Sequence, residues 1–389
     1  MRDAMSSERG SGGSPRIEWI DALRGFSMLL VVSYHVAQIC FDINLKKSSS
    51  MPLLLLVRMP LFFFISGFLA YKPALLWTGR RACAMAWKKV RVQVVPAFLF
   101  LCVSVAITCT TKSPFLSGLQ SALSCSTKGG YWFTWVLLLM LLLYYSVCSL
   151  AAWSSRLGEP SGSEASVLPG ARERSLQDHA ILALFIVSLA LYETAYVPQW
   201  DKALWQHPWA YACSVRLLVI YLPFFLFGNL ARRHWTGLQR LLESRWFFPV
   251  LVGVAFFSAC EAIRWHTLRH EWANLPRTLA MYSLLLVVVA TFRHHQAVFS
   301  RRTAVGRGLQ CIGRRTLDIY LLHFILMPRL RMCKPFFDSN PQDFLIEQAI
   351  FLALALLVTG ACLLVSALLR TSPLLAKWLF GAEKKRPRG

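Results

Sequence analysis

The chain has 389 residues, of which 56 % are hydrophobic and only 16 % are charged. Soluble domains usually carry about 25 % charged residues, so this composition excludes an ordinary soluble protein and indicates a membrane protein. The net charge of +23 is no sign of nucleic acid binding, because no RNA-recognition, zinc-finger or helix-turn-helix pattern accompanies it. We therefore expect no nucleic acid partner.

Apolar runs of about 20 residues recur along the chain, and each is long enough to cross about 30 Å of hydrocarbon. We predict about ten spans: 19–41, 51–71, 92–110, 132–152, 180–197, 212–231, 247–264, 275–292, 309–328 and 347–369. With a cytoplasmic N-terminus, most Lys and Arg fall in inner segments, which is the positive-inside pattern and makes both termini cytoplasmic. The expected fold is an all-α, polytopic transmembrane helix bundle in the lipid bilayer.

The chain is expected to form one membrane domain with two polar ends. We predict a disordered cytoplasmic N-terminal tail over 1–15, a transmembrane domain over 16–370, and a basic cytoplasmic tail over 371–389. The 11 Cys form no C-x-x-C pair and lie mostly within spans, which indicates apolar packing. We therefore expect no metal site, and the residues suggest no bound cofactor.

The first span carries three ionisable residues, Asp21, Arg24 and His35. Such groups are unfavourable at membrane depth and usually mark a functional site. Arg24 and His35 are eleven residues apart, almost three helical turns, so they share a face, and His35 lies roughly 16 Å deeper. One helix is therefore predicted to present a cation near the surface and a titratable base deep inside.

Only one other histidine lies well inside an apolar run. Of the 9 His, seven fall in predicted loops or at helix ends, which leaves His35 and His323. Tyr320 precedes His323 by three residues and shares its helix face. A single buried His is as readily a hydrogen-bonded packing residue, but two at bilayer depth favour a histidine base or a proton relay.

Other candidates have structural explanations of equal or greater weight. Ser66 is a conceivable nucleophile, but no G-x-S-x-G elbow surrounds it, and close helix packing is favoured. Lys88 and Arg91 suit a polyphosphate or a lipid head group, although positive-inside charge explains them equally well. Trp132 and Trp135 indicate an interfacial aromatic belt or, alternatively, the wall of a sugar-binding groove.

Taken in order, these stretches resemble the integral-membrane acyltransferase 3 family, whose members O-acylate bacterial polysaccharides and other glycans. The matching stretches are Asp21-x-x-Arg24-Gly25 with His35, PLFFFISGFL at 60–69, Lys88-x-x-Arg91 before Pro96, YWFTWVL at 131–137, LPFFLFGNLAR at 222–232 and IGRRTLDIYLLH at 312–323. They extend from residue 16 to about residue 330, and ten spans is the count that the resemblance implies.

The resemblance also implies roles for particular residues. His35 matches the family's essential histidine, Arg24 its first-span arginine, and His323 with Tyr320 its ninth-span pattern. The pair at 88 and 91 matches an Arg-x-x-Arg motif thought to meet the acyl-CoA donor. Two positions depart from the pattern. Lys88 replaces the first arginine and loses bidentate phosphate geometry, and Tyr131 stands where a histidine is common.

The function that the resemblance implies is O-acylation of a glycan. An acyl group, most commonly acetyl, would move from cytoplasmic acyl-CoA to a hydroxyl of a surface glycan or lipid-linked saccharide, at a bacterial inner (plasma) membrane and alongside polysaccharide-assembly proteins. His35 would act either as general base or as an acylated carrier. The alternatives are a proton-coupled transporter or flippase, and a non-catalytic membrane component of polysaccharide export.

Overall fold

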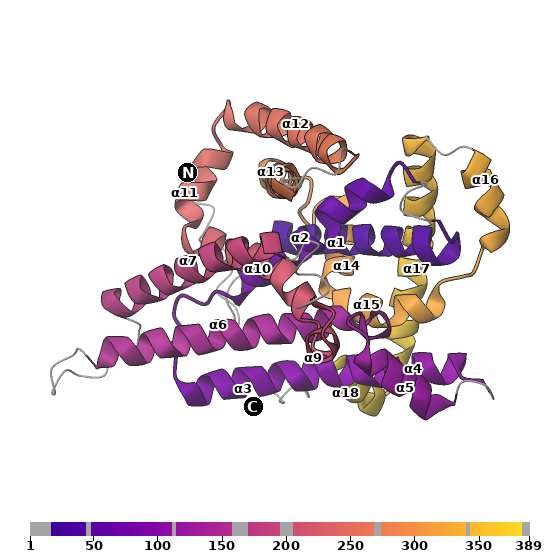
Figure 1. Cartoon of the computed structure of the whole chain (residues 1–389), viewed down its shortest axis with the longest axis horizontal. Helices are drawn as coiled ribbons and strands as arrows, with labels where there is room; N and C mark the ends of the chain where they lie inside the picture. The colour runs from indigo at the N-terminus through magenta and orange to yellow at the C-terminus, as the bar shows by residue number, and fades with distance from the viewer. Residues whose placement is uncertain are drawn as a thin grey trace.

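A computed structural model describes residues 17–43, 48–110, 114–157, 170–194, 205–267, 274–339 and 343–382. These residues form an all-helical fold without β-strands (Figure 1). The longer helices are α1 Glu18–His35, α2 Met51–Ala70, α3 Gly79–Lys89, α4 Val95–Thr108, α5 Phe115–Ser124, α6 Trp132–Arg156, α7 Ala171–Thr194, α10 Val215–Arg233, α12 Phe247–Thr267, α13 Asn274–His294, α14 Ala304–Arg314, α15 Thr316–Leu326 and α17 Phe344–Leu369. The shorter ones are α9 Pro208–Ala212, α11 Trp235–Leu242, α16 Lys334–Ser339 and α18 Pro373–Phe380, with π-helical turns at Val36–Cys40 and Val90–Val94 and 3-10 turns at Lys128–Gly130 and Arg331–Cys333.

Eight helices in the described part of the chain are long and apolar enough to cross a membrane. They are α1 with its π-helical end, α2, α3 continuous with α4, α6, α7, α10, α13 and α17. A ninth candidate is the pair α11 and α12, which meet at a bend of 86°. Figure 1 shows α3 and α6 side by side, and α17 packs against α1 and α15. The prediction of a polytopic helical bundle is confirmed.

Residues 309–328, expected as one span, form parts of two helices, α14 and α15. The helical path breaks at Arg315, whose backbone has φ −113° and ψ 20°. Arg315 pairs with the buried carboxylate of Asp318 at 3.1 Å, and Arg370 of α17 holds the same carboxylate at 2.8 Å. These ion pairs anchor the start of α15 against α17. The short helix α15 is apolar but has only 11 residues.

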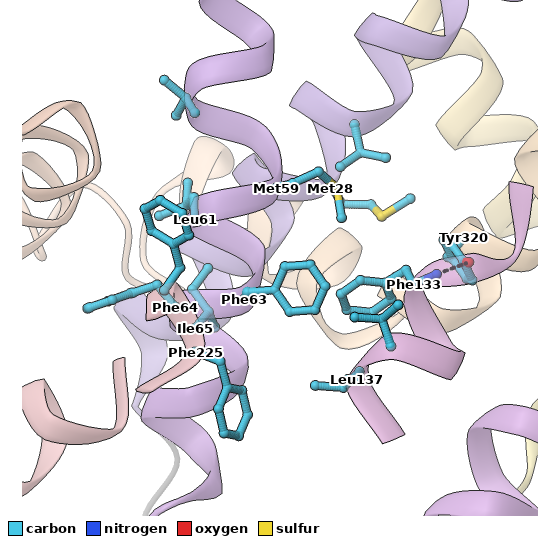
Figure 2. Close-up of a cluster of buried hydrophobic side chains, with 14 of the residues drawn as sticks. Met28, Met59, Leu61, Phe63, Phe64, Ile65, Phe133, Leu137, Phe225 and Tyr320 are labelled. Atoms are coloured by element: carbon cyan, nitrogen blue, oxygen red, sulfur yellow. Dashed lines mark hydrogen bonds between the residues drawn. The ribbon is translucent and has the colours of Figure 1, made fainter. Parts of the chain in front are cut away.

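Glycines allow two close helix crossings. A Cβ atom on Gly67 of α2 would lie 1.8 Å from the carbonyl oxygen of Phe225 in α10, and one on Gly228 of α10 would lie 2.0 Å from that of Phe64. Because glycine has no Cβ, the two backbones meet directly. Figure 2 shows the phenylalanines of this region, with Phe63 of α2 pointing toward Phe133 of α6. This packing fixes α2, which lines the site described below.

The crossing of α1 and α14 has the same construction. A Cβ atom on Gly25 would lie 2.0 Å from the carbonyl oxygen of Leu309, and one on Gly313 would lie 1.8 Å from that of Asp21. The close approach brings α1 beside the start of α15. The guanidinium of Arg24 consequently donates a hydrogen bond to Thr316 Oγ1 at 3.0 Å.

Two contacts join the segments that follow α1 and α15. The backbone N–H of Leu330 donates to the carbonyl oxygen of Cys40 at 2.7 Å. Lys334 Nζ donates to Asp42 Oδ2 at 3.0 Å, and this hydrogen bond and charge lower the pKa of the Asp42 carboxyl. The two helices that carry the predicted histidines are thus held together at that end.

The segment expected to be a C-terminal tail begins with a helix. Helix α18 packs against α4, with the rings of Phe380 and Phe100 6.1 Å apart. Gly381 ends α18 with a φ of +60°, a conformation that favours glycine. The expected N-terminal tail, 1–15, and the last residues of the chain lie outside the described residues.

Candidate active site

A cavity of ≈ 250 Å³ lies between α1, α2, α6 and α15 and beside the end of α3. We call it the cationic cavity, and its principal polar lining residues are Arg24, Ser66, Lys72, Lys89, Thr316 and Tyr320. No acidic residue of the described chain lines it. Lys89 lies within electrostatic range of Lys72 and Arg24. A cluster of cations in a wall without acidic residues favours an anionic ligand.

Lys88 and Arg91 do not line this cavity. Both side chains are exposed, whereas Lys89 between them is partly buried and reaches the cavity wall. The π-helical turn Val90–Val94 starts directly after Lys89. A π turn inserts extra backbone into the helical repeat, so the i, i+3 spacing of Lys88 and Arg91, which would give them a common face in a regular α-helix, does not do so across this turn.

A second, much smaller cavity surrounds His35. It measures ≈ 20 Å³, and we call it the histidine chamber. Its walls include His35 of α1, Arg58 of α2, and Trp132 and Phe133 of α6. A space of roughly 10–15 Å³ is enough for one water molecule, so the chamber accommodates one small polar group.

The two predicted histidines lie against each other. The ring centroids of His35 and His323 are 5.4 Å apart. His323 is fully buried and lines neither cavity, and its Nδ1 lies 3.0 Å from the carbonyl oxygen of Ile319. Since a carbonyl only accepts hydrogen bonds, Nδ1 is assigned the proton and Nε2 is left as the basic nitrogen. His35 therefore faces the chamber, with His323 behind it.

Three aromatic side chains separate the two cavities. Phe62, Phe133 and Tyr320 line both of them, and we call this set the aromatic partition. The rings of Phe62 and Phe133 are 4.7 Å apart in an edge-to-face arrangement. The Tyr320 hydroxyl donates to the carbonyl oxygen of Gly130 and accepts from the N–H of Phe133, both at 3.2 Å, and Figure 2 shows the second bond. These bonds hold Tyr320 at the boundary between the cavities.

The other candidates lie in different surroundings. Ser66 lines the cationic cavity, but its hydroxyl donates to the carbonyl oxygen of Phe62 at 2.9 Å within the same helix. Trp132 faces the histidine chamber and stacks on Tyr221 with ring centroids 5.5 Å apart. Trp135 instead lines a separate apolar groove of ≈ 300 Å³. The two tryptophans therefore do not form one wall.

Asp21 lies on the helix that supplies Arg24 and interacts electrostatically with it, without lining the cationic cavity. Three basic residues of the two cavities were not among the sequence candidates, namely Lys72, Lys89 and Arg58. A signal for Arg58 was present, because it is the sole charged residue in the apolar stretch 51–70. Nothing in the sequence distinguishes Lys89 from the neighbouring basic residues Lys88 and Arg91.

Comparison with known families gives the class of protein. A family model described as an acyltransferase domain matches residues 17–370, nearly the whole chain. The chain therefore belongs to the acyltransferase 3 family, and the predicted resemblance is confirmed. Together with its apolar helices, this identifies a membrane acyltransferase. No significant match was found among the curated proteins or the solved structures.

Proposed function

We propose that the protein transfers an acetyl group from acetyl-CoA to a hydroxyl of a glycan or a lipid-linked saccharide, at a bacterial inner membrane. The observation that supports this most is the pairing of a cationic cavity with a histidine chamber behind one aromatic partition. A CoA thioester is a polyanion at one end and a small neutral electrophile at the other. In this proposal the polyanionic end binds at the cationic cavity, and the thioester end reaches the histidine chamber.

The size of the cationic cavity suggests how the donor lies. Its ≈ 250 Å³ is less than the roughly 300–1,000 Å³ of pockets for drug-sized ligands, so CoA does not fit inside as a whole. The pantetheine arm enters between α2 and α15, and the phosphates remain with the cations at the cavity. The exposed Lys88 and Arg91 lie near the nucleotide outside the cavity in this arrangement, in agreement with the role that the family resemblance implies.

His35 is the general base of this proposal. It takes the proton of the acceptor hydroxyl while the hydroxyl oxygen attacks the thioester carbon, and the departing CoA thiolate then recovers that proton. Nδ1 of His35 is buried and has no hydrogen-bond partner in the described part of the chain, so no internal acceptor or donor competes for it.

The test is an assay of the whole chain reconstituted in lipid nanodiscs. Acetyl-labelled acetyl-CoA is mixed with purified polysaccharides and lipid-linked saccharides, and we measure both labelled product and free CoA thiol. We expect label in the saccharide with equal release of CoA. Movement of saccharide across a vesicle membrane without acylation would identify a transporter or flippase and overturn the proposal. His295→Ala, an exposed histidine outside both cavities, is the control.

A further inference from the structure

One buried cation in the membrane region is not explained by the donor site. Arg58 is the single charged residue of α2 and lies well inside that helix. Only 8 % of it is exposed, and it lines the histidine chamber and not the cationic cavity. It is therefore separated from the CoA phosphates of the proposed function by the aromatic partition.

The guanidinium of Arg58 has incomplete partners. Its carbon lies 3.6 Å above the ring of Tyr34, a cation–π contact, and its Nε is buried with no hydrogen-bond partner in the described part of the chain. Among the described residues, the titratable groups that interact electrostatically with Arg58 are Tyr34, which is also its side-chain hydrogen-bond partner, Tyr221 and His35, and none is a carboxylate. A buried cation without a counter-charge is unfavourable unless an anion arrives during function.

The chamber sets the size and chemistry of that anion. A space of ≈ 20 Å³ admits a group about as large as one water molecule or one carbonyl oxygen. It does not admit a phosphate, a sulfate or a carboxylate-bearing acyl chain. His35 in the same wall places the proposed base beside this position. The chamber therefore suits a negative charge that is carried by a single oxygen atom.

We infer that Arg58 is a catalytic residue that binds the thioester carbonyl oxygen and stabilises its negative charge in the transition state. This inference rests on the proposed function. As the acceptor oxygen bonds to the carbonyl carbon, the C=O pair moves onto oxygen and is held by the guanidinium N–H groups. The C–S bond then breaks, the C=O bond re-forms, and the thiolate takes the proton from His35, giving ester and CoA.

The test compares Arg58→Met and Arg58→Lys with Arg302→Met, an exposed arginine outside both cavities. Removing an oxyanion donor lowers kcat by about 10²–10³-fold in well-studied enzymes, so we expect this loss in Arg58→Met with little change in the KM for acetyl-CoA. Arg58→Lys keeps the charge and should retain more activity. Full activity of a folded Arg58→Met protein overturns the inference and leaves the acyltransferase proposal intact.

A second measurement does not depend on a variant that folds. The wild-type protein is saturated with an acetyl-CoA analogue in which CH₂ replaces sulfur and the ketone carbon is ¹³C. We expect the ketone signal to move downfield on binding, because the cation polarises the carbonyl. A bound ketone at its free-solution position overturns the role of Arg58. A shifted ketone in a protein that transfers no acyl group instead overturns the proposed function alone.

Discussion

The cationic cavity and the histidine chamber have walls from the same four helices, α1, α2, α6 and α15, yet they differ in size and in chemistry. The cavity is ≈ 250 Å³, whereas the chamber is ≈ 20 Å³. The cations of the cavity include two lysines, whose flexible side chains suit an extended polyanion. The chamber holds one histidine and one arginine against aromatic rings. The cavity thus has the properties of a recognition site, and the chamber those of a reaction site.

The largest effect is expected in the chamber. His35→Ala removes the proposed base and should lower acyl transfer by about 10²–10⁴-fold, because general base catalysis typically contributes that factor. The measurement is labelled product formation, with size-exclusion profiles to show that the variant is folded. His295→Ala should behave as wild type. Near-normal transfer by His35→Ala would mean that the chamber is not the reaction site.

The same variant tests the acylated-carrier mechanism. Wild-type protein incubated with labelled acetyl-CoA and no acceptor should stay unlabelled if His35 only moves a proton. Label that remains on the protein after denaturation, and is absent from His35→Ala, would establish the carrier mechanism instead.

A smaller loss of activity is expected from substitution of His323, which packs against His35 but does not line the chamber. His323 contacts His35 through its ring and donates from Nδ1 to Ile319, so we expect it to position His35. Misplacing a catalytic group by about 1 Å can cost about 10²-fold, and His323→Ala should approach that loss in kcat. His323→Asn keeps a donor near Nδ1 and should recover part of the rate. Equal losses in both variants would indicate that Nε2 itself takes part in proton transfer.

The histidine pair was predictable from sequence because α1 is continuous from Glu18 to His35. Regular α-helical spacing predicts that Arg24 and His35 lie on the same face of α1. In the structure Arg24 lines the cationic cavity and His35 lines the histidine chamber. The family membership could also be predicted, since several weak motifs occur in order from residue 16 to about residue 330, and the family model matches 17–370. The apolar runs alone were enough to predict a polytopic helical bundle.

The rest depended on local backbone and on tertiary packing. Lys89, and not Lys88 or Arg91, reaches the cavity, and a π-helical turn follows it directly; no hydropathy pattern reveals such a turn. Arg58 was overlooked because an apolar run with a single charged residue is still predicted to be a membrane span. At the break, Arg315 pairs with Asp318, and the same carboxylate binds Arg370 of α17, a residue far along the chain that no local pattern connects to it.

A matched pair of substitutions tests the cavity. Lys89→Ala removes a cation that lines the cavity, and we expect the KM for acetyl-CoA to rise about tenfold, as for loss of one charged hydrogen bond worth roughly 1.5 kcal/mol. Arg91→Ala removes an exposed cation from the same segment, and its effect should be smaller and should fade with added salt. The KM for the saccharide should not change in either. A larger effect of Arg91→Ala would locate the principal donor contacts outside the cavity.

An effect on acyl-chain selectivity is expected at the boundary between the two regions. Phe62 lines both cavities, so Phe62→Ala should remove part of the aromatic partition and enlarge the chamber. An acetyl-only site rejects longer chains by crowding, and one methylene is worth roughly 10–200-fold in discrimination. We therefore expect the preference for acetyl-CoA over propionyl-CoA, which is one methylene longer, to fall by about tenfold when measured as a ratio of kcat/KM values, at the lower end of that range. Phe256→Ala, which removes a ring that is 74 % exposed on α12, should leave the ratio unchanged. An unchanged ratio in Phe62→Ala would show that acyl length is read elsewhere, and that the partition merely packs the helices together.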